Sequence, residues 1–317
     1  MTELVRTPDQ AGEPREPASL AVSVVGVPGN RRRSALTRPS GAATVIVWIS
    51  VVYSLVPVVW LVFAATKSNQ DLFSTFGLWF GHSDLFVHNL AQTFSYSGGI
   101  YLRWLANSFW YAAVSAVGAA SLATLAGYAL AKYRFPGREA VNVLVIGAIM
   151  VPMTALAIPT YLLFSKVGIT NTALAVVLPS MVSPFAAFFM REYARRAVDK
   201  SLIEAARIDG ARELRIFSRI ALPLLAPGVA SMLLFTFVGT FNNYFLPLVM
   251  LNSNSLLPVN VGLAQWNALG GSNGTNTTAF FPMVMTGSLV AIVPLVVSFF
   301  ILQRYWQAGL ASGAVKA

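Results

Sequence analysis

The sequence contains no cysteine among its 317 residues, and it has few charged side chains. Disulfide bonds, thiolate metal ligands and cysteine nucleophiles are therefore excluded. Charged residues make up 11% of the chain and hydrophobic residues 56%, which is far more apolar than a soluble domain of this length. Several apolar runs reach the ~20 residues that a helix needs to cross a bilayer. The composition indicates an integral membrane protein.

The chain also lacks a phosphate-binding loop of the GxxxxGK[ST] type, so it has no nucleotide cradle of its own. Its two histidines, His82 and His88, are six residues apart without a cysteine nearby, and this pattern does not predict a metal site. No cofactor is expected in this chain. All acidic residues lie outside the predicted hydrocarbon cores, where an ion-driven carrier usually keeps a carboxylate. An ion-coupled secondary carrier is therefore a weaker alternative.

Six apolar runs predict an all-α fold with six transmembrane helices. Residues 1–40 are rich in Pro, Gly and charge, and we expect them to form a disordered cytoplasmic tail. A cleaved export signal is the alternative, but the first apolar run is longer than a signal core. Residues 41–317 form one transmembrane domain, with spans at about 42–65, 107–131, 141–165, 172–191, 224–251 and 280–303.

Lys and Arg are unevenly distributed between alternate loops, and short loops that carry them stay in the cytoplasm. Basic residues gather in the tail, after the second span and in the loop at residues 192–223, whereas residues 252–279 carry no charge. Both termini are therefore predicted to be cytoplasmic, in a multi-pass protein of a bacterial inner membrane. The same retention explains the net charge of +10 without invoking nucleic acid.

Prolines interrupt most of the predicted spans. Each proline removes a backbone donor and favours a kink. Kinked helices suit a moving pathway, but they also occur in static membrane bundles. The prolines concerned are Pro57, Pro152, Pro159, Pro179, Pro184, Pro247 and Pro294.

The charged loop, residues 192–223, differs from the other loops in being too regular for a linker. Residues 202–208 favour a helix, Gly210 permits a turn, and residues 213–220 favour a second short helix closed by Pro223. We expect a helix–turn–helix pair whose apolar residues form a stripe on which another protein can dock. The stripe comprises Ile203, Ala206, Ile208, Leu214, Phe217 and Ile220.

This loop resembles the signature of permease subunits of binding-protein-dependent ABC importers, which reads Glu-Ala-Ala, three residues, Gly, nine residues, Ile-x-Leu-Pro. Every position matches, as Glu204, Ala205, Ala206, Gly210, Ile220, Leu222 and Pro223. In that family the loop is a coupling helix that sits in a groove of a separate ATPase subunit. The resemblance implies that these residues, together with Asp209, couple transport to ATP hydrolysis.

Further similarities cover roughly residues 42–317 and point to the carbohydrate-uptake group, in particular to the smaller maltose-type permease. They comprise Val151-Pro152, Ile158-Pro159-Thr160-Tyr161, Pro184-Phe185 through Met190-Arg191, the run at residues 205–211, Gly309-Leu310, and Gly313-Ala314-Val315-Lys316. The resemblance implies a permease, not an enzyme, that moves a sugar or oligosaccharide into the cell by alternating access. A permease of an importer for another small solute is the nearest alternative.

The same resemblance implies the partners of the chain. They are a second permease subunit, forming a heterodimer rather than a homodimer, two ATPase subunits that bind ATP and Mg²⁺, and an extracytoplasmic solute-binding protein. A structural or receptor membrane protein would not need the signature at its spacing.

Polar residues within the fifth predicted span, Asn242, Asn243 and Tyr244, are candidates for the solute pathway. Unpaired amides cost free energy in lipid, so these side chains must face protein, water or solute. A tyrosine ring can stack on a sugar and an amide can bind paired hydroxyls, while hydrogen bonding between helices is the alternative. The family often has Trp-Asn here, and this chain departs from it. Weaker candidates are Thr160, Tyr161 and Asn107.

Overall fold

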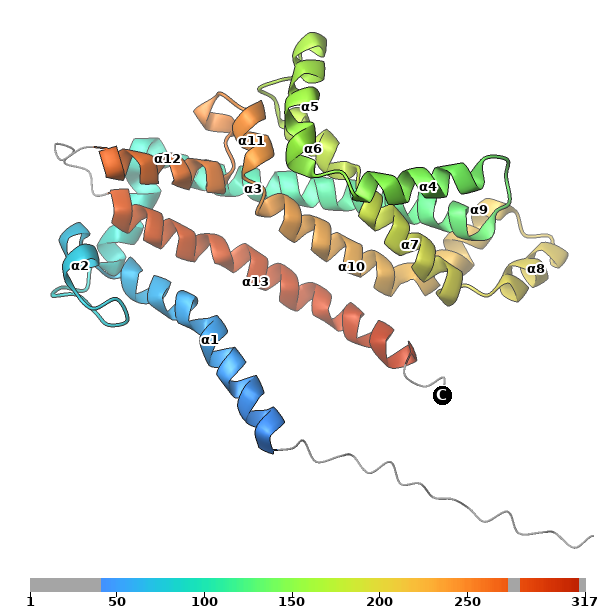
Figure 1. Ribbon diagram of the computed structural model, residues 1–317, viewed down its shortest axis with the longest axis horizontal. Helices are drawn as coiled ribbons and strands as arrows, with labels where there is room; N and C mark the ends of the chain where they lie inside the picture. The colour runs from blue at the N-terminus through green and yellow to red at the C-terminus, as the bar shows by residue number, and fades with distance from the viewer. Residues whose placement is uncertain (1–40, 273–279, 314–317) are drawn as a thin grey trace, which may run out of the picture. The chain divides into compact units, whose positions relative to one another are not determined.

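The computed structural model describes residues 41–272 and 280–313, and the regular elements in these ranges are all helices (Figure 1). The predicted tail, residues 1–40, lies outside the described residues. The chain divides into two compact units, residues 1–52 and 53–317, and the boundary falls inside the first helix. The predicted all-α class is confirmed.

Helices long and apolar enough to cross a membrane account for five of the six predicted spans, and a bent pair accounts for the remaining one. The pair is α4 (Arg138–Ile149) and α5 (Met153–Val167). The chain bends by 104° at the break between them, where a single straight span was expected. The other five are α1 (Gly41–Ala65), α3 (Phe86–Lys132), α6 (Ala173–Met181) with α7 (Pro184–Ala197), α9 (Glu213–Ile216) through α10 (Leu222–Phe241), and α13 (Phe280–Gly313).

Shorter helices lie between the spans. They are α2 (Asn69–Ser74), α8 (Lys200–Ile208), the π-helix η1 (Phe217–Ala221), α11 (Phe245–Met250), the 3₁₀ turn η2 (Asn254–Leu256) and α12 (Val259–Ser272).

The central helix α3 is broken near its start, so its spanning part differs from the predicted one. Tyr96 has an extended ψ, and Ser97, Gly98 and Gly99 all have positive φ values, which glycine adopts without strain. The continuous helix therefore runs from Ile100 to Lys132 and starts seven residues earlier than the predicted span at 107.

Small residues on α3 allow α7 to pack closely against it. Ala119, Ala123 and Ala131 are buried, and a Cβ atom on Gly127 would lie 2.6 Å from the backbone nitrogen of Arg191. Such a surface lets two helix backbones approach each other. The result is a closely packed α3–α7 pair from which the charged loop extends.

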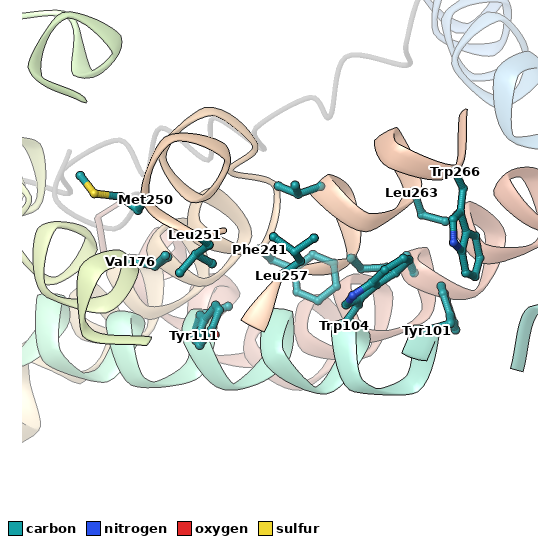
Figure 2. Close-up of a cluster of buried hydrophobic side chains, with 14 of the residues drawn as sticks. Tyr101, Trp104, Tyr111, Val176, Phe241, Met250, Leu251, Leu257, Leu263 and Trp266 are labelled. Atoms are coloured by element: carbon teal, nitrogen blue, oxygen red, sulfur yellow. The ribbon is translucent and has the colours of Figure 1, made fainter. Parts of the chain in front are cut away.

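Aromatic residues on the other half of α3 join it to the segment that follows α11 (Figure 2). The rings of Trp104 and Trp266 lie 5.0 Å apart, and the indole nitrogen of Trp104 donates to the carbonyl of Asn254 at 2.8 Å. The hydroxyl of Tyr111 donates to the carbonyl of Leu256 at 2.9 Å. Trp104 and Tyr111 thus bury their rings while their polar tips keep hydrogen-bond partners.

Candidate functional site

The charged loop folds as predicted around α8 and the turn at Gly210. The helix starts after Asp199, whose carboxylate accepts from the amide of Ser201 at 3.0 Å. This hydrogen bond holds the pKa of the Asp199 carboxyl below its ordinary value. At the other end Gly210 has φ +75°, and its amide and that of Ala211 donate to the carbonyls of Arg207 and Ala206. These two bonds form a Schellman motif, which favours glycine at this position.

Two boundaries of the loop differ from the prediction. Helix α7 continues to Ala197, so the first residues of the predicted loop are helical. The expectation that Pro223 closes the second short helix is wrong, because α9 passes through η1 into α10 without a break. The amide of Leu222 bonds to the carbonyl of Phe217, and this wider π turn accommodates a proline that lacks a donor.

The predicted apolar stripe is divided between two faces. Ile203 and Ala206 are buried in the cluster that includes residues of α3 and α7, and Phe217 and Ile220 pack against it partly buried, whereas Ile208 is 87% exposed and Leu214 80% exposed. The side chains of Ile208 and Leu214 are therefore accessible from outside the chain.

The signature residues follow the same division. Glu204, Ala205, Asp209 and Gly210 are exposed, and Ala206 is buried. Farther along, Leu222 and Pro223 are exposed and Ile220 is partly buried. Glu204, Ala205 and Ile208 share one face of α8, because residues three or four apart lie side by side on a helix. We call this face, together with Leu214, the docking face.

One carboxylate, that of Glu213, links α8 to the end of α3. Glu213 accepts from Nε of Arg207 at 2.7 Å and from the hydroxyl of Tyr133 at 2.6 Å. Tyr133 is the residue that ends α3, and the neighbouring Lys132 donates through Nζ to the carbonyl of Val198. These contacts join α8 and the residues around it to the end of α3.

A second candidate site lies where three helix breaks meet. The breaks separate α4 from α5, α6 from α7, and α10 from α11. Two cavities of about 360 and 300 Å³ open there, and their shared wall includes Val151, Val182, Pro184 and Asn243. We call them the paired cavities. Irregular backbone at membrane depth is tolerated where it lines such a space.

The structure separates the six predicted pathway residues. Asn243 lines both cavities and Thr160 lines the second, whereas Asn242, Tyr244, Tyr161 and Asn107 line neither. The amide of Asn107 instead donates to the carbonyls of Ser255 and Leu257. That contact joins helix to loop.

The placement of residues 242–244 inside a continuous fifth span is wrong, because α10 ends at Phe241 and α11 begins at Phe245. The side-chain oxygen of Asn243 accepts from the amide of Leu246 at 3.3 Å and so covers the start of α11. An asparagine in the break thus replaces a missing backbone partner.

Sequence reasoning missed Thr236 and Thr240, which line the first cavity together with Asn243. The three residues are four and three positions apart, so they lie along one face of α10 and its end. A polar stripe at this spacing in an apolar span could have identified them. Among the described residues, no ionisable side chain lines either cavity.

The histidine at position 82 is paired rather than free. Its Nδ1 lies 2.6 Å from a carboxylate oxygen of Asp71, and this contact lowers the pKa of Asp71. Within the residues that the structure describes, His, Asp and Glu form no group of three that could hold a metal ion. The pair links α2 to the loop that follows it.

Comparison with known proteins gives three kinds of match. Residues 119–311 match the family described as binding-protein-dependent transport system inner membrane component. An arabinooligosaccharides transport system permease protein of Halalkalibacterium halodurans is 37% identical over 82% of this chain and 90% of the relative. A lactose transport system permease protein of Rhizobium radiobacter is 31% identical over 83% of this chain and 91% of the relative. A solved bacterial ABC transporter involved in the import of the acidic polysaccharide alginate shares the fold, with a TM-score of 0.72, 21% identity, and coverage of 84% of this chain and 95% of that one.

Proposed function

The chain belongs to the family of binding-protein-dependent transport system inner membrane components, and from this premise we propose that it carries a neutral oligosaccharide into the cell. As a member of this family it is a permease subunit of an ABC importer and not an enzyme.

The lining of the paired cavities carries the proposal for the solute. Hydroxyl and amide groups from Thr160, Thr236, Thr240 and Asn243 face space enclosed by apolar side chains, without an ionisable group from the described residues. A charged solute in such surroundings would lack a counter-charge and would cost several kcal/mol to desolvate. A hydroxylated neutral solute matches these donors and acceptors. The names of the relatives, which include arabinooligosaccharides and lactose, support the same class.

The docking face supports the proposal for coupling. Glu204 and Ala205 are exposed beside Ile208 and Leu214, so a groove of an ATPase subunit can receive them. Closure of two ATPase subunits on ATP and Mg²⁺ would move α8, and the contacts of Glu213 would pass this movement to α3. A rigid-body shift of this kind alternates access to the paired cavities between the two sides of the membrane.

The remaining partners follow from the same proposal. A second permease subunit completes the pathway, and an extracytoplasmic solute-binding protein delivers the solute. Both termini and the charged loop face the cytoplasm, with residues 1–40 as a tail and residues 41–317 as the transmembrane domain. Because the chain lacks cysteine, labelling of Ser201→Cys and Asn252→Cys tests the orientation. A membrane-impermeant reagent added outside should modify only Asn252→Cys, and the reverse pattern would overturn it.

Uptake by cells with and without the chain tests the solute class. The panel contains radiolabelled arabino-oligosaccharides, lactose, maltodextrin, an amino acid and inorganic phosphate. Loss of the chain should lower uptake of at least one neutral oligosaccharide by more than about 10-fold and leave the amino acid and phosphate unchanged. A selective loss of phosphate or amino-acid uptake would contradict the proposal.

Two adjacent asparagines provide a matched test of the route. Asn243 lines both cavities and Asn242 lines neither, although they differ by one position. Asn243→Ala should raise the solute concentration for half-maximal uptake by about 5- to 10-fold, as expected for one lost hydrogen bond. Asn242→Ala should leave it within 2-fold. Equal effects of the two substitutions would place the route elsewhere.

A further inference from the structure

A basic pocket lies where α3, α4, α7 and α8 meet at the end of the bundle that carries the charged loop. Its volume is about 420 Å³, and one carboxylate, that of Asp199, stands among the charged side chains that line it. This carboxylate already accepts a hydrogen bond from the amide of Ser201 at the start of α8. Six cations line the pocket, namely Lys132, Arg134, Arg138, Arg195, Arg196 and Lys200.

Three of these cationic side chains make a hydrogen bond or an ion pair within the chain, and three make neither to a described residue. Lys132 and Arg138 donate to backbone carbonyls, and Arg195 pairs with Glu192 at 2.9 Å. The side chains of the other three have neither an ion pair nor a hydrogen bond to any described residue, and they are Arg134, Arg196 and Lys200. Retention of a loop in the cytoplasm needs positive charge but not its convergence into one hollow. Six cations in one pocket repel one another, and a bound anion would relieve this repulsion.

An apolar groove lies along three of the same helices, α3, α4 and α7. Its volume is about 330 Å³, and Met181 and Ala187 also line it. Its walls are formed by Ala119, Leu122, Ala123 and Ala126 of α3 and by Val141, Leu144, Val145 and Ala148 of α4. From Ala126 to Lys132 is six residues, or about 9 Å along a helix, and from Val141 to Arg138 is three residues, or about 4.5 Å. A ligand that joins an anion to a hydrocarbon chain across such a distance can occupy both spaces.

We propose that the basic pocket and the apolar groove form a binding site for one anionic phospholipid. The phosphate lies among Arg134, Arg196 and Lys200, and an acyl chain lies between α3 and α4. Basic pockets between membrane helices recognise headgroups in this way. A partner helix could fill the groove, but it would leave the three cations without an anion, whereas a phospholipid satisfies both spaces. The inference needs only the membrane location of the chain and does not depend on the solute it carries.

The test uses the complete purified complex in detergent, titrated with phosphatidylglycerol or phosphatidylcholine of the same chain length and examined by native mass spectrometry. The combined variant Arg134→Gln, Arg196→Gln and Lys200→Gln should weaken phosphatidylglycerol binding on the order of 100-fold. A charge-matched control replaces Arg212, Arg215 and Arg219 with Gln, three arginines that lie outside the basic pocket. The control should change binding by less than about 3-fold. Equal loss in both variants would overturn the proposal.

A second pair of variants tests the acyl chain. Leu122 lines the groove and is 49% exposed, and Leu125 is 53% exposed on the same helix but does not line it. Leu122→Trp should fill the groove and weaken phosphatidylglycerol binding at least 10-fold, and Leu125→Trp should not. Displacement of the lipid by millimolar inorganic phosphate, without an effect of Leu122→Trp, would assign the pocket to free phosphate. A disulfide between Leu122→Cys and the partner permease would show that a protein helix covers the groove. Either result would overturn the proposal.

Discussion

The charged loop and the paired cavities lie in the same unit of the chain, but different kinds of contact hold their residues in place. In the charged loop a cap, a glycine turn and a carboxylate each fix one step of the backbone. Around the cavities the backbone is interrupted three times, and apolar side chains form most of the wall. In the proposed transport cycle, the loop passes on the movement of the ATPase subunits, while the broken helices change arrangement around the solute.

Two neighbouring alanines in the loop give the largest expected effect, because one faces inward and the other outward. Ala206 is 7% exposed among Ile203 and Ile216, so Ala206→Trp overpacks the cluster and should prevent recovery of an assembled complex. Ala205→Trp adds the same volume to the docking face and should leave folding intact while lowering uptake more than about 10-fold. The measurements are subunit recovery after purification and uptake into liposomes.

Ala226→Trp is the control for added bulk, because Ala226 is exposed on α10 outside the charged loop. Normal recovery of Ala206→Trp, or normal uptake with Ala205→Trp, would show that the two faces of α8 have been confused. Sequence alone assigns both alanines to the groove of the ATPase subunit, and the structure distinguishes them.

The glycine turn gives the next largest effect. A Cβ atom on Gly210 would meet nothing within 4 Å, so any cost of substitution comes from its φ of +75° and not from a clash. Gly210→Val should destabilise the turn by about 1–2 kcal/mol, and Gly210→Asn by less, because asparagine tolerates this conformation. Uptake per ATP hydrolysed should fall in the order wild type, Asn, Val. A valine variant with undiminished coupling would remove the turn from the transmission route.

The two regions also differ in how much of them could be predicted from sequence. Gly210 and the charges of the loop are local determinants, because a helix stop or a cap depends on a few adjacent residues. The turn at Gly210 was therefore predictable. The all-α class and the number of membrane spans were also predictable, because they depend on long apolar runs within the sequence. The inward position of Ala206 was not, because it depends on how α8 lies against α3 and α7.

The cavities depend on contacts between residues far apart in the chain, and this is why their prediction was incomplete. Val151, Val182 and Asn243 lie at breaks in three separate spans. The sequence pattern does not indicate that these three helix breaks lie next to one another in space. Prolines near the breaks, such as Pro152 and Pro184, indicate that kinks are possible but not how large they are. Asn243 and Thr160 were predicted as pathway residues from their polarity, and that role stays a prediction.

The contact between Glu213 and Tyr133 gives a smaller effect that tests the route from α8 to α3. Tyr133→Phe removes one hydrogen bond to a partly exposed carboxylate, worth roughly 1 kcal/mol. We expect normal assembly with uptake per ATP lowered about 2- to 5-fold. Tyr193→Phe is the control, because the hydroxyl of Tyr193 makes no hydrogen bond to a described residue. Similar coupling in both variants would mean that α8 acts on the bundle by another contact.

The smallest expected effect is a dependence on pH at the start of α8. The amide of Ser201 lowers the pKa of the Asp199 carboxyl from its ordinary value of 3.8. Since the folded pKa is below the unfolded one, the contribution of this cap is complete above about pH 4 and is lost as the pH falls through the folded pKa. Hydrogen exchange of the α8 amides, normalised to intrinsic rates, should therefore show protection that decreases below pH 4. Asp199→Asn keeps an acceptor without a titrating group, so its protection should remain constant over the same range, whereas Asp199→Ala should lose protection at every pH. If wild type and Asp199→Asn respond identically to acid, a group other than the Asp199 carboxyl sets the stability of α8. The start of the charged loop would then not be fixed by this local cap.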